Sequence, residues 1–264
     1  MRQTSMKKLS GLRFNRLSPW LLGLAAAAFI PASAHAALVI VLNDVTDGSS
    51  ATFTDPTTSA LPSTTYTIAD GTLGGGNITY QNVEATSNSP GTASFARVNL
   101  ASADLTNNTG APITVKITVG DTSYSAPGGP GSTLSLLGSY AGTYDPTASG
   151  SVQMSSYADA LNGANASSSP TASTSSGTTT FNGSFVVPNS FSGGTPPTIF
   201  ARSATSPGLY SLAGITTLVL NPGGTVDLSD NSVTFAVASV PEPTSLALLG
   251  MGSFFLFHRR RRNA

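Results

Sequence analysis

An alternation of apolar and polar residues over residues 113–119 is the feature that most constrains how this chain folds. Ile, Val, Ile and Val at positions 113, 115, 117 and 119 alternate with Thr114, Lys116 and Thr118. A period of two gives a strand one apolar and one polar face, which is the pattern of a half-buried antiparallel strand. The Asn-Asn-Thr-Gly run at residues 107–110 predicts a turn immediately before this strand.

Similar short segments recur along the chain and are separated by Gly, Pro, Asn and Asp. The continuous apolar run at residues 37–42 predicts a buried first strand. The spacing of the segments predicts an all-β fold, an antiparallel β-sandwich with a jelly-roll-like arrangement. The remaining strands are expected at residues 51–54, 65–69, 77–83, 92–100, 132–137, 180–187, 199–202, 209–212, 215–220, 225–228 and 233–238.

Two segments break this pattern. Residues 153–161 are predicted to begin as a strand and to end in the only helix of the body, with Ser156 as its cap. Residues 162–180 are rich in Ser, Thr, Ala and Gly and carry no charge, so they predict a long flexible loop with little to bury.

The first 36 residues have the composition of a cleavable secretory signal. Lys7, Lys8, Arg13 and Arg16 precede an apolar stretch at residues 19–30. Small residues then create two cleavage sites, and we expect the cut after Ala36, with Ala34 as the alternative. Residues 1–36 are therefore predicted to be a signal peptide that is absent from the mature protein.

Residues 240–264 consist of a proline-rich segment, an apolar run and a basic end. Each proline fixes its own φ and holds the preceding residue extended. The apolar run at residues 244–257 would span about 21 Å as a helix, against a hydrocarbon core of about 30 Å, so it predicts a temporary membrane-sorting helix. The basic end is costly to move across a bilayer, so it is expected to stay in the cytoplasm and to act as a membrane stop. It consists of Arg259, Arg260, Arg261 and Arg262.

The order of these three parts resembles the PEP-CTERM protein-sorting signal of Gram-negative bacteria, a motif also named as the ice-binding protein C-terminal domain. The resemblance implies that the tail is held in the inner membrane, recognised by an exosortase after the secretion machinery has exported the chain, and removed. The recognition residues would be Pro241, Glu242 and Pro243. It also implies a final location at the cell surface or in the extracellular matrix, in organisms that make exopolysaccharide.

Removing both ends changes the charge of the protein. The body at residues 37–239 has three basic residues against eleven acidic ones, a formal net charge of −8. Such a body does not suit nucleic acid, whose phosphates require clustered Lys and Arg. His35 and His258 both lie outside the body and the chain has no Cys, so the body lacks the usual transition-metal ligands and the commonest general base.

Few residues of the body suggest catalysis. Lys116 could serve a Ser–Lys pair but is interpreted as a solvated strand residue, and Glu84 is the only glutamate of the body. Two segments that begin at Asp47 and Asp121 loosely match an aspartic-protease motif and are interpreted as turns. We therefore expect no enzymatic activity, with a secreted glycan-active enzyme as the weakest of three hypotheses.

Calcium is the one cofactor compatible with this composition, because it takes oxygen ligands and needs neither His nor Cys. Candidate ligands cluster at two predicted loops, the first around Asp44 and Asp47 with Asn43, the second around Asp227 and Asp230 with Asn231. Neither loop matches an EF-hand, and turn formation by Asp and Asn is the alternative. We expect no other cofactor.

The leading hypothesis is an exported structural protein of the cell surface or of an exopolysaccharide-containing biofilm matrix. The alternative is a carbohydrate- or calcium-binding adhesion module. Seven tyrosines could stack on sugar rings if several shared one face, although strand tyrosines are more often half-buried. These are Tyr66, Tyr80, Tyr124, Tyr140, Tyr144, Tyr157 and Tyr210.

Overall fold

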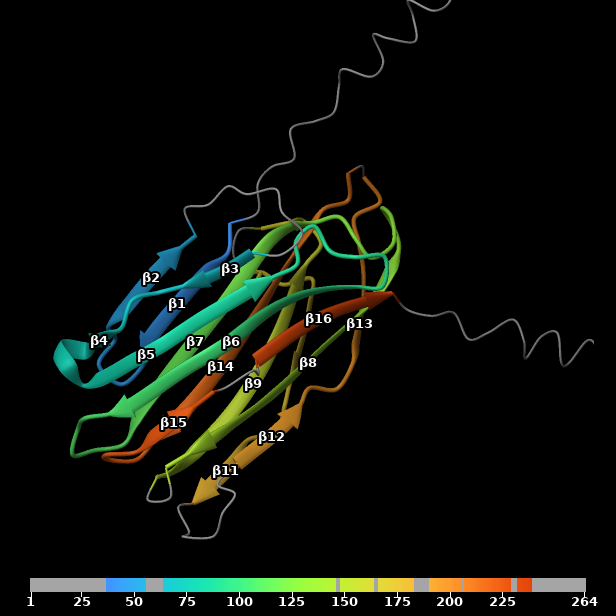
Figure 1. Cartoon of the computed structure of the whole chain (residues 1–264). Coiled ribbons are helices and arrows are strands. Elements are labelled where there is room, and N and C mark those ends of the chain that lie inside the picture. Colours follow the sequence, from blue (N-terminus) through green and yellow to red (C-terminus); the bar gives the residue numbers. More distant parts are fainter. Residues whose placement is uncertain are drawn as a thin grey trace, which may run out of the picture. The chain divides into compact units, whose positions relative to one another are not determined.

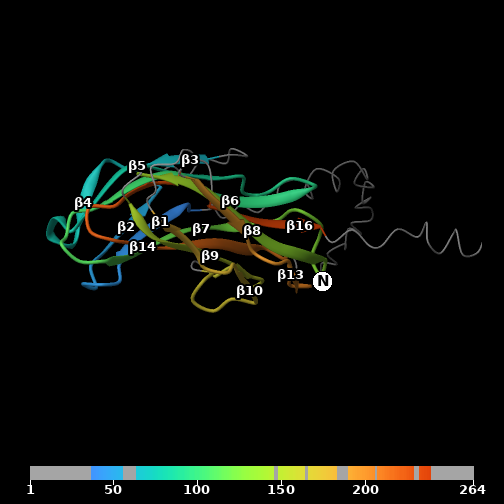
Figure 2. The same ribbon diagram turned by 90° about the horizontal axis from the view of Figure 1, so that it is seen from below.

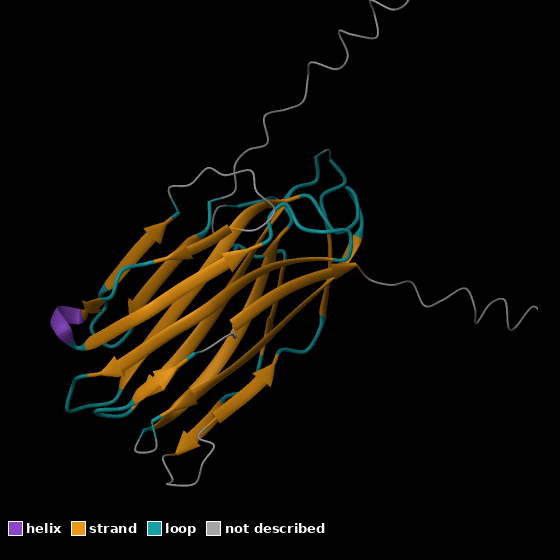
Figure 3. Cartoon of the chain, in the orientation of Figure 1, coloured by secondary structure: helices purple, strands orange, loops and turns teal. Residues whose placement is uncertain are grey.

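Strands are the main secondary structure of the computed structural model (Figure 3), which describes residues 37–55, 64–145, 148–163, 166–182, 190–205, 207–228 and 232–238. The predicted signal peptide, the sorting tail and its membrane helix lie outside these residues. Within the described part the only helix is the 3₁₀ turn Gly74–Gly76, and no helix there is long and apolar enough to cross a membrane.

Seven of the described strands form one sheet. They are β1 (Val39–Asp44), β2 (Ser50–Thr54), β7 (Ile113–Tyr124), β9 (Ser149–Asp159), β10 (Ala172–Ser175), β11 (Thr179–Asn182) and β14 (Tyr210–Leu220). Their order across the sheet is β10, β9, β14, β7, β1, β2, and β11 also pairs with β9. The long strands β7 and β14 therefore lie at its centre.

The other nine described strands form the second sheet. They are β3 (Thr64–Thr67), β4 (Gly71–Leu73), β5 (Ile78–Ser87), β6 (Phe95–Asn107), β8 (Thr133–Tyr144), β12 (Ser190–Gly194), β13 (Thr198–Ala201), β15 (Thr225–Asp227) and β16 (Ser232–Ala238). Both β15 and β16 lie between β6 and β8, with β5 and β3 beyond β6 and with β12 and β13 beyond β8.

The two sheets form the two layers of a sandwich (Figures 1 and 2). Strand pairing within each sheet is antiparallel, and the chain changes sheet between β6, β7, β8 and β9 in succession. Strands distant in sequence thereby become neighbours, which is the arrangement of a jelly roll. The prediction of an antiparallel, jelly-roll-like β-sandwich is confirmed.

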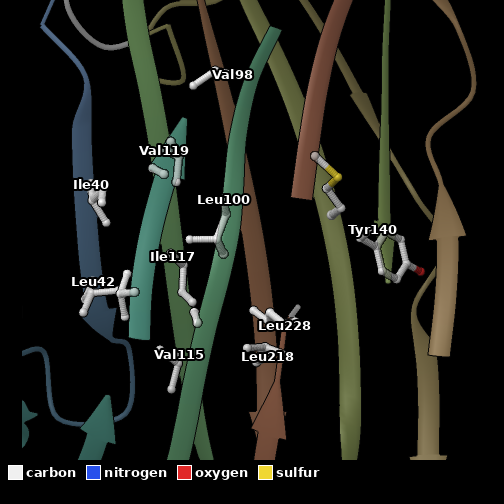
Figure 4. Packing of buried hydrophobic residues seen from close by; sticks show 14 of the residues in the cluster. Ile40, Leu42, Val98, Leu100, Val115, Ile117, Val119, Tyr140, Leu218 and Leu228 are labelled. Carbon is white, nitrogen blue, oxygen red and sulfur yellow. The ribbon is translucent and has the colours of Figure 1, made fainter. Parts of the chain in front are cut away.

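The core lies between the sheets and contains the apolar residues of the alternating strands (Figure 4). In β7 the four predicted apolar residues are 1–3% exposed, whereas Lys116 is exposed. Burying each such side chain stabilises the fold by about 1.5–3 kcal/mol. In β6 the inward residues are Ala96, Val98 and Leu100, and Phe95 lies on the opposite face, half-buried.

The predicted helix within residues 153–161 is wrong, because β9 continues as a strand to Asp159. β9 pairs with β14 on one side and with β10 and β11 on the other, so its backbone groups are hydrogen-bonded without a helix. Ser156 and Ala158, expected at the helix start, point inward and are 0% exposed. Tertiary pairing therefore overrides local propensity here.

The prediction of a flexible loop at residues 162–180 is wrong for its second half. Residues Ala172–Ser175 form β10 and pair with residues 155–158 of β9. Strand pairing uses backbone groups, so this segment needs no apolar run, although Ala172 and Thr174 are largely buried. Within this predicted loop, residues 164 and 165 lie outside the described part of the chain.

Two predicted strands, at residues 209–212 and 215–220, form the single strand β14. Gly214 does not interrupt this strand. A Cβ atom at position 214 would lie 2.8 Å from Thr234 Oγ1 and 3.4 Å from the Met154 methyl group, so glycine here makes room for side chains between the sheets. The strands β4 and β12 were not predicted, because their glycine-rich sequences resemble turns.

Candidate functional site

The folded body begins and ends at the same end of the sandwich. Val39, at the start of β1, pairs with Gly120 near the end of β7. Val237, at the end of β16, pairs with Phe95 at the start of β6 (Figure 1). The Tyr124 hydroxyl at the end of β7 donates a hydrogen bond to the Arg97 carbonyl near the start of β6. We call this the exit end; it also contains loops 125–132 and 202–209.

Arg202 organises the exit end. Its side chain is 3% exposed, and its guanidinium centre lies 5.2 Å from the centre of the Tyr210 ring. The described residues offer it no carboxylate; instead Nε, Nη1 and Nη2 donate five hydrogen bonds of 2.7–3.0 Å to backbone carbonyls. These carbonyls belong to Ser125, Pro127, Gly128 and Gly208. Arg202 therefore ties the two loops of the exit end together.

A buried carboxyl group also lies at the exit end, near the end of β7. Asp121 is 2% exposed, and its Oδ1 accepts a hydrogen bond of 2.6 Å from the Thr122 amide. Burial raises the pKa of Asp121 to about 6, hydrogen bonds from Ser87 and Thr122 oppose the rise, and the neighbouring Asp55 carboxylate adds to it. Burial likewise raises the pKa of Tyr124, whose hydroxyl lies 2.8 Å from the Ser87 hydroxyl. The Asp121-Thr122-Ser123 segment, predicted as a turn, belongs to β7.

The Asp121→Asn variant is expected to change how stability depends on pH. The folded pKa of about 6 lies above the ordinary aspartate value of 3.8, so the stabilisation from protonated Asp121 is complete below about pH 4 and is lost as pH rises through 6. The loss amounts to about 3 kcal/mol. Asparagine is uncharged and still accepts the Thr122 hydrogen bond. Chemical denaturation from pH 4 to 8 should therefore show the native protein losing stability relative to the variant as pH rises from 4 to about 6, with no further relative loss above that. Parallel curves would contradict this.

The structure places the calcium candidates in different settings. Asp44 ends β1 and is 0% exposed, and Asp47 is exposed in the following turn. The nearby hydroxyl and the hydrogen-bonded amide of Ser49 lower the pKa of Asp47, and Asn77 donates to its second carboxylate oxygen. Asp227 lies in β15 opposite Asp104, and Asp230 is outside the described residues, as is Asn231. Among the described residues no three His, Cys, Asp or Glu side chains converge as for a metal ion.

The tyrosines do not form an exposed platform in the described structure. Tyr124 and Tyr210 are 0% exposed, and Tyr80 and Tyr140 are also buried. Tyr144 stacks on Phe181 with 4.8 Å between ring centres, and Phe181 stacks in turn on Phe191. These rings extend the core towards the β11 and β12 edge. The three half-buried tyrosines are Tyr66, Tyr144 and Tyr157.

The outward side of the seven-stranded sheet, called here the outer face, mixes polar and apolar side chains and carries few charges. Across β1, β7, β14 and β9, one row of paired residues contains Val41, Thr118, Ile215 and Ser155. The next row contains Asn43, Lys116, Thr217 and Gln153, so these two rows contribute one charged side chain between them. Lys116 projects from this face. Glu84, on the second sheet, accepts a hydrogen bond of 3.4 Å from the Thr67 hydroxyl.

The predicted sorting and cleavage residues lie outside the described part of the chain. They are Ala34, Ala36, Pro241, Glu242, Pro243 and the arginines Arg259, Arg260, Arg261 and Arg262. The sequence did not indicate Arg202 or Asp121 as a pair of buried groups at one end. One signal was available for Arg202, because it is one of only three basic residues in the body and lies beside a turn-rich segment.

Comparison with known proteins identifies the tail. Residues 239–262 match the family model described as the PEP-CTERM protein-sorting motif, so the chain carries this motif and is indicated to be an exported, membrane-sorted protein. No curated protein matches the sequence. The match begins one residue after β16 ends at Ala238.

Two solved structures are similar at low identity. One is described under carbohydrate-binding modules of the β-sandwich superfamily with promiscuous specificity; it shares 13% identity over 75% of this chain and 72% of that chain, with a TM-score of 0.28. The other is the mannan-recognising carbohydrate-binding module TmCBM27, at 10% identity over 68% of this chain and 90% of that chain, with a TM-score of 0.24.

Proposed function

We propose that the protein is a non-enzymatic structural component of the cell surface or of an exopolysaccharide-containing biofilm matrix, sorted and processed by an exosortase. The observation that carries this proposal is the PEP-CTERM motif at residues 239–262, directly after the last strand of a folded β-sandwich. An exosortase acting near Pro241 would release a body that keeps every described strand.

The position of the exit end supports the same proposal. The predicted signal peptide precedes β1, and the sorting motif follows β16, and both strands reach the exit end. While either hydrophobic segment remains in the inner membrane, the exit end is therefore the part of the body attached to it. The outer face of the seven-stranded sheet is then left free for contacts in the matrix.

Alanine replacement of Pro241, Glu242 and Pro243 is expected to block processing. In the native host, most of the protein should shift from the cell surface or medium to the inner-membrane fraction, with a mass that includes the arginine-ended tail. The Pro222→Ala variant, which changes a turn proline of the body, serves as the matched control. Intact-mass measurement of both fractions tests this, and normal release of the triple variant would contradict the proposal.

Carbohydrate binding is the alternative function. The outer face supports it, because Lys116 of β7 and Gln153 of β9 lie on either side of Thr217 of β14, and the half-buried Tyr157 lies further along β9, so hydroxyl-rich polymers could form hydrogen bonds there. A glycan array with the processed protein, repeated with the host exopolysaccharide, separates this alternative from a purely structural role.

A further inference from the structure

The turn between β1 and β2 contains an acidic side chain whose charge has no partner. Asp44 follows Ile40 and Leu42 on the inward side of β1 and is 0% exposed. Its Oδ1 accepts a hydrogen bond of 2.8 Å from the Thr46 amide, but its Oδ2 is buried and accepts none. An ionised carboxylate in this position costs several kcal/mol unless a positive charge compensates it.

Positive side chains do not reach Asp44 within the described structure. Among the described residues, the only hydrogen bond to the Asp44 carboxylate comes from the Thr46 backbone amide. The nearest basic residue in the pairing scheme is Lys116, which lies opposite Asn43 and projects from the outward side of the same sheet. Arg97 and Arg202 belong to the exit end, whereas the β1–β2 turn is at the other end of the sandwich.

Two further oxygen-bearing side chains, those of Ser49 and Asp47, belong to the turn that follows Asp44. The Asp44 amide donates to the Ser49 carbonyl at 2.9 Å, so residues 44 and 49 are directly opposite and their side chains share the inward face. Ser49 Oγ is buried and makes no hydrogen bond of normal geometry, although it lies near the Asp47 carboxylate. Asp47 is held in place by the Ser49 amide at 2.7 Å and by Asn77.

We propose that the β1–β2 turn binds a hard cation, with Ca²⁺ as the best match, through Asp44 Oδ2, Ser49 Oγ and the Asp47 carboxylate. Carboxylate and hydroxyl oxygens are the ligands that Ca²⁺ accepts, and its variable coordination allows water to complete the shell on the exposed side of Asp47. The cation neutralises the buried charge of Asp44 and links β1 and β2 at the end of the sandwich that is opposite the exit end. This site is separate from the sorting function proposed above.

Thermal unfolding and calorimetry of the full chain in mild detergent test this site. With CaCl₂ at about 100 times its Kd, the midpoint should rise by about 5–10 °C over the same protein in EDTA. The Asp44→Asn and Ser49→Ala variants should lose this rise and the heat of binding. The control Asp70→Asn removes an exposed acidic residue elsewhere and should keep both.

The apo proteins provide a second test with the opposite sign. In EDTA the Asp44→Asn variant should be at least as stable as the native protein, because its amide is neutral and can donate to Ser49 Oγ. The proposal is overturned if CaCl₂ leaves the native midpoint unchanged, or if Asp44→Asn keeps the rise. A Ser49→Ala variant that is less stable than the native protein to the same extent in EDTA and in CaCl₂ would assign Ser49 to an internal hydrogen bond instead.

Discussion

Replacing Arg202 by methionine is expected to lower the free energy of unfolding by about 3–5 kcal/mol. Methionine retains part of the buried apolar stem but donates no hydrogen bonds. The carbonyls of loops 125–132 and 202–209 that Arg202 now satisfies would be left without their donor inside the exit end. Denaturant unfolding measures the loss directly, and the thermal midpoint should fall by about 10 °C.

Two further variants separate the roles of charge and geometry at position 202. Arg202→Lys keeps the charge but loses the planar fork that reaches both loops at once, so its stability should lie between those of the native protein and Arg202→Met. Lys116→Met removes an exposed basic residue and should change stability by less than about 0.5 kcal/mol. If the free energy of unfolding of Arg202→Met lies within about 1 kcal/mol of the native value, the strands rather than Arg202 hold the loops in place.

The strands with regular alternation could be predicted from the sequence, because a period of two in apolar residues by itself specifies which face of the strand is buried. Residues 113–119 alternate apolar with polar, and the structure buries the apolar set. The strand predicted at residues 92–100 lacks this regularity, because Phe95 and Val98 stand at positions of opposite parity and cannot share a face. The structure resolves this by pairing β6 with β16, so that Val98 points inward with Thr234 beside it in register.

Segments whose conformation depends on a distant partner could not be predicted. Ser156 and Ala158 have acceptable helix propensity, and only the pairing with β14 and β10 makes them strand residues. β10 itself has almost no apolar signal and forms because the edge of β9 offers unpaired backbone groups. Two strands were predicted on either side of Gly214, although this glycine continues the strand and leaves space for the side chain of Thr234.

The functional residues divide in the same way. Pro241, Glu242 and Pro243 could be identified from sequence because a sorting signal is read as a short linear segment, and the family model confirms the motif. Arg202 and Asp121 act through loops and strands that are up to about 80 residues apart in the chain, and no local pattern connects them. The predicted Asp44 and Asp47 are placed in one turn, but the unpartnered oxygen of Asp44 is visible only in the fold.

Asn107→Ala is expected to destabilise the end of the sandwich opposite the exit end by about 2–4 kcal/mol. Asn107 is 0% exposed, and its amide donates to the Ala111 carbonyl at 2.8 Å and to the Leu220 carbonyl at 2.9 Å. Its Oδ1 accepts hydrogen bonds from the Thr109 amide and hydroxyl at 2.8 and 2.7 Å. One side chain thus joins the β6–β7 turn to the end of β14, and alanine would leave all four groups without this partner.

The neighbouring asparagine provides the matched control for this prediction. Asn108 is exposed, and its amide donates to the Gly76 carbonyl and the Thr79 hydroxyl, so water can replace both bonds in Asn108→Ala. We expect that variant to lose less than about 1 kcal/mol in the same denaturation experiment. Asn107→Asp keeps the shape but replaces two donors with a buried charge, so it should be at least as destabilised as Asn107→Ala at pH 7. Equal losses for Asn107→Ala and Asn108→Ala would show that burial of Asn107 does not determine the cost.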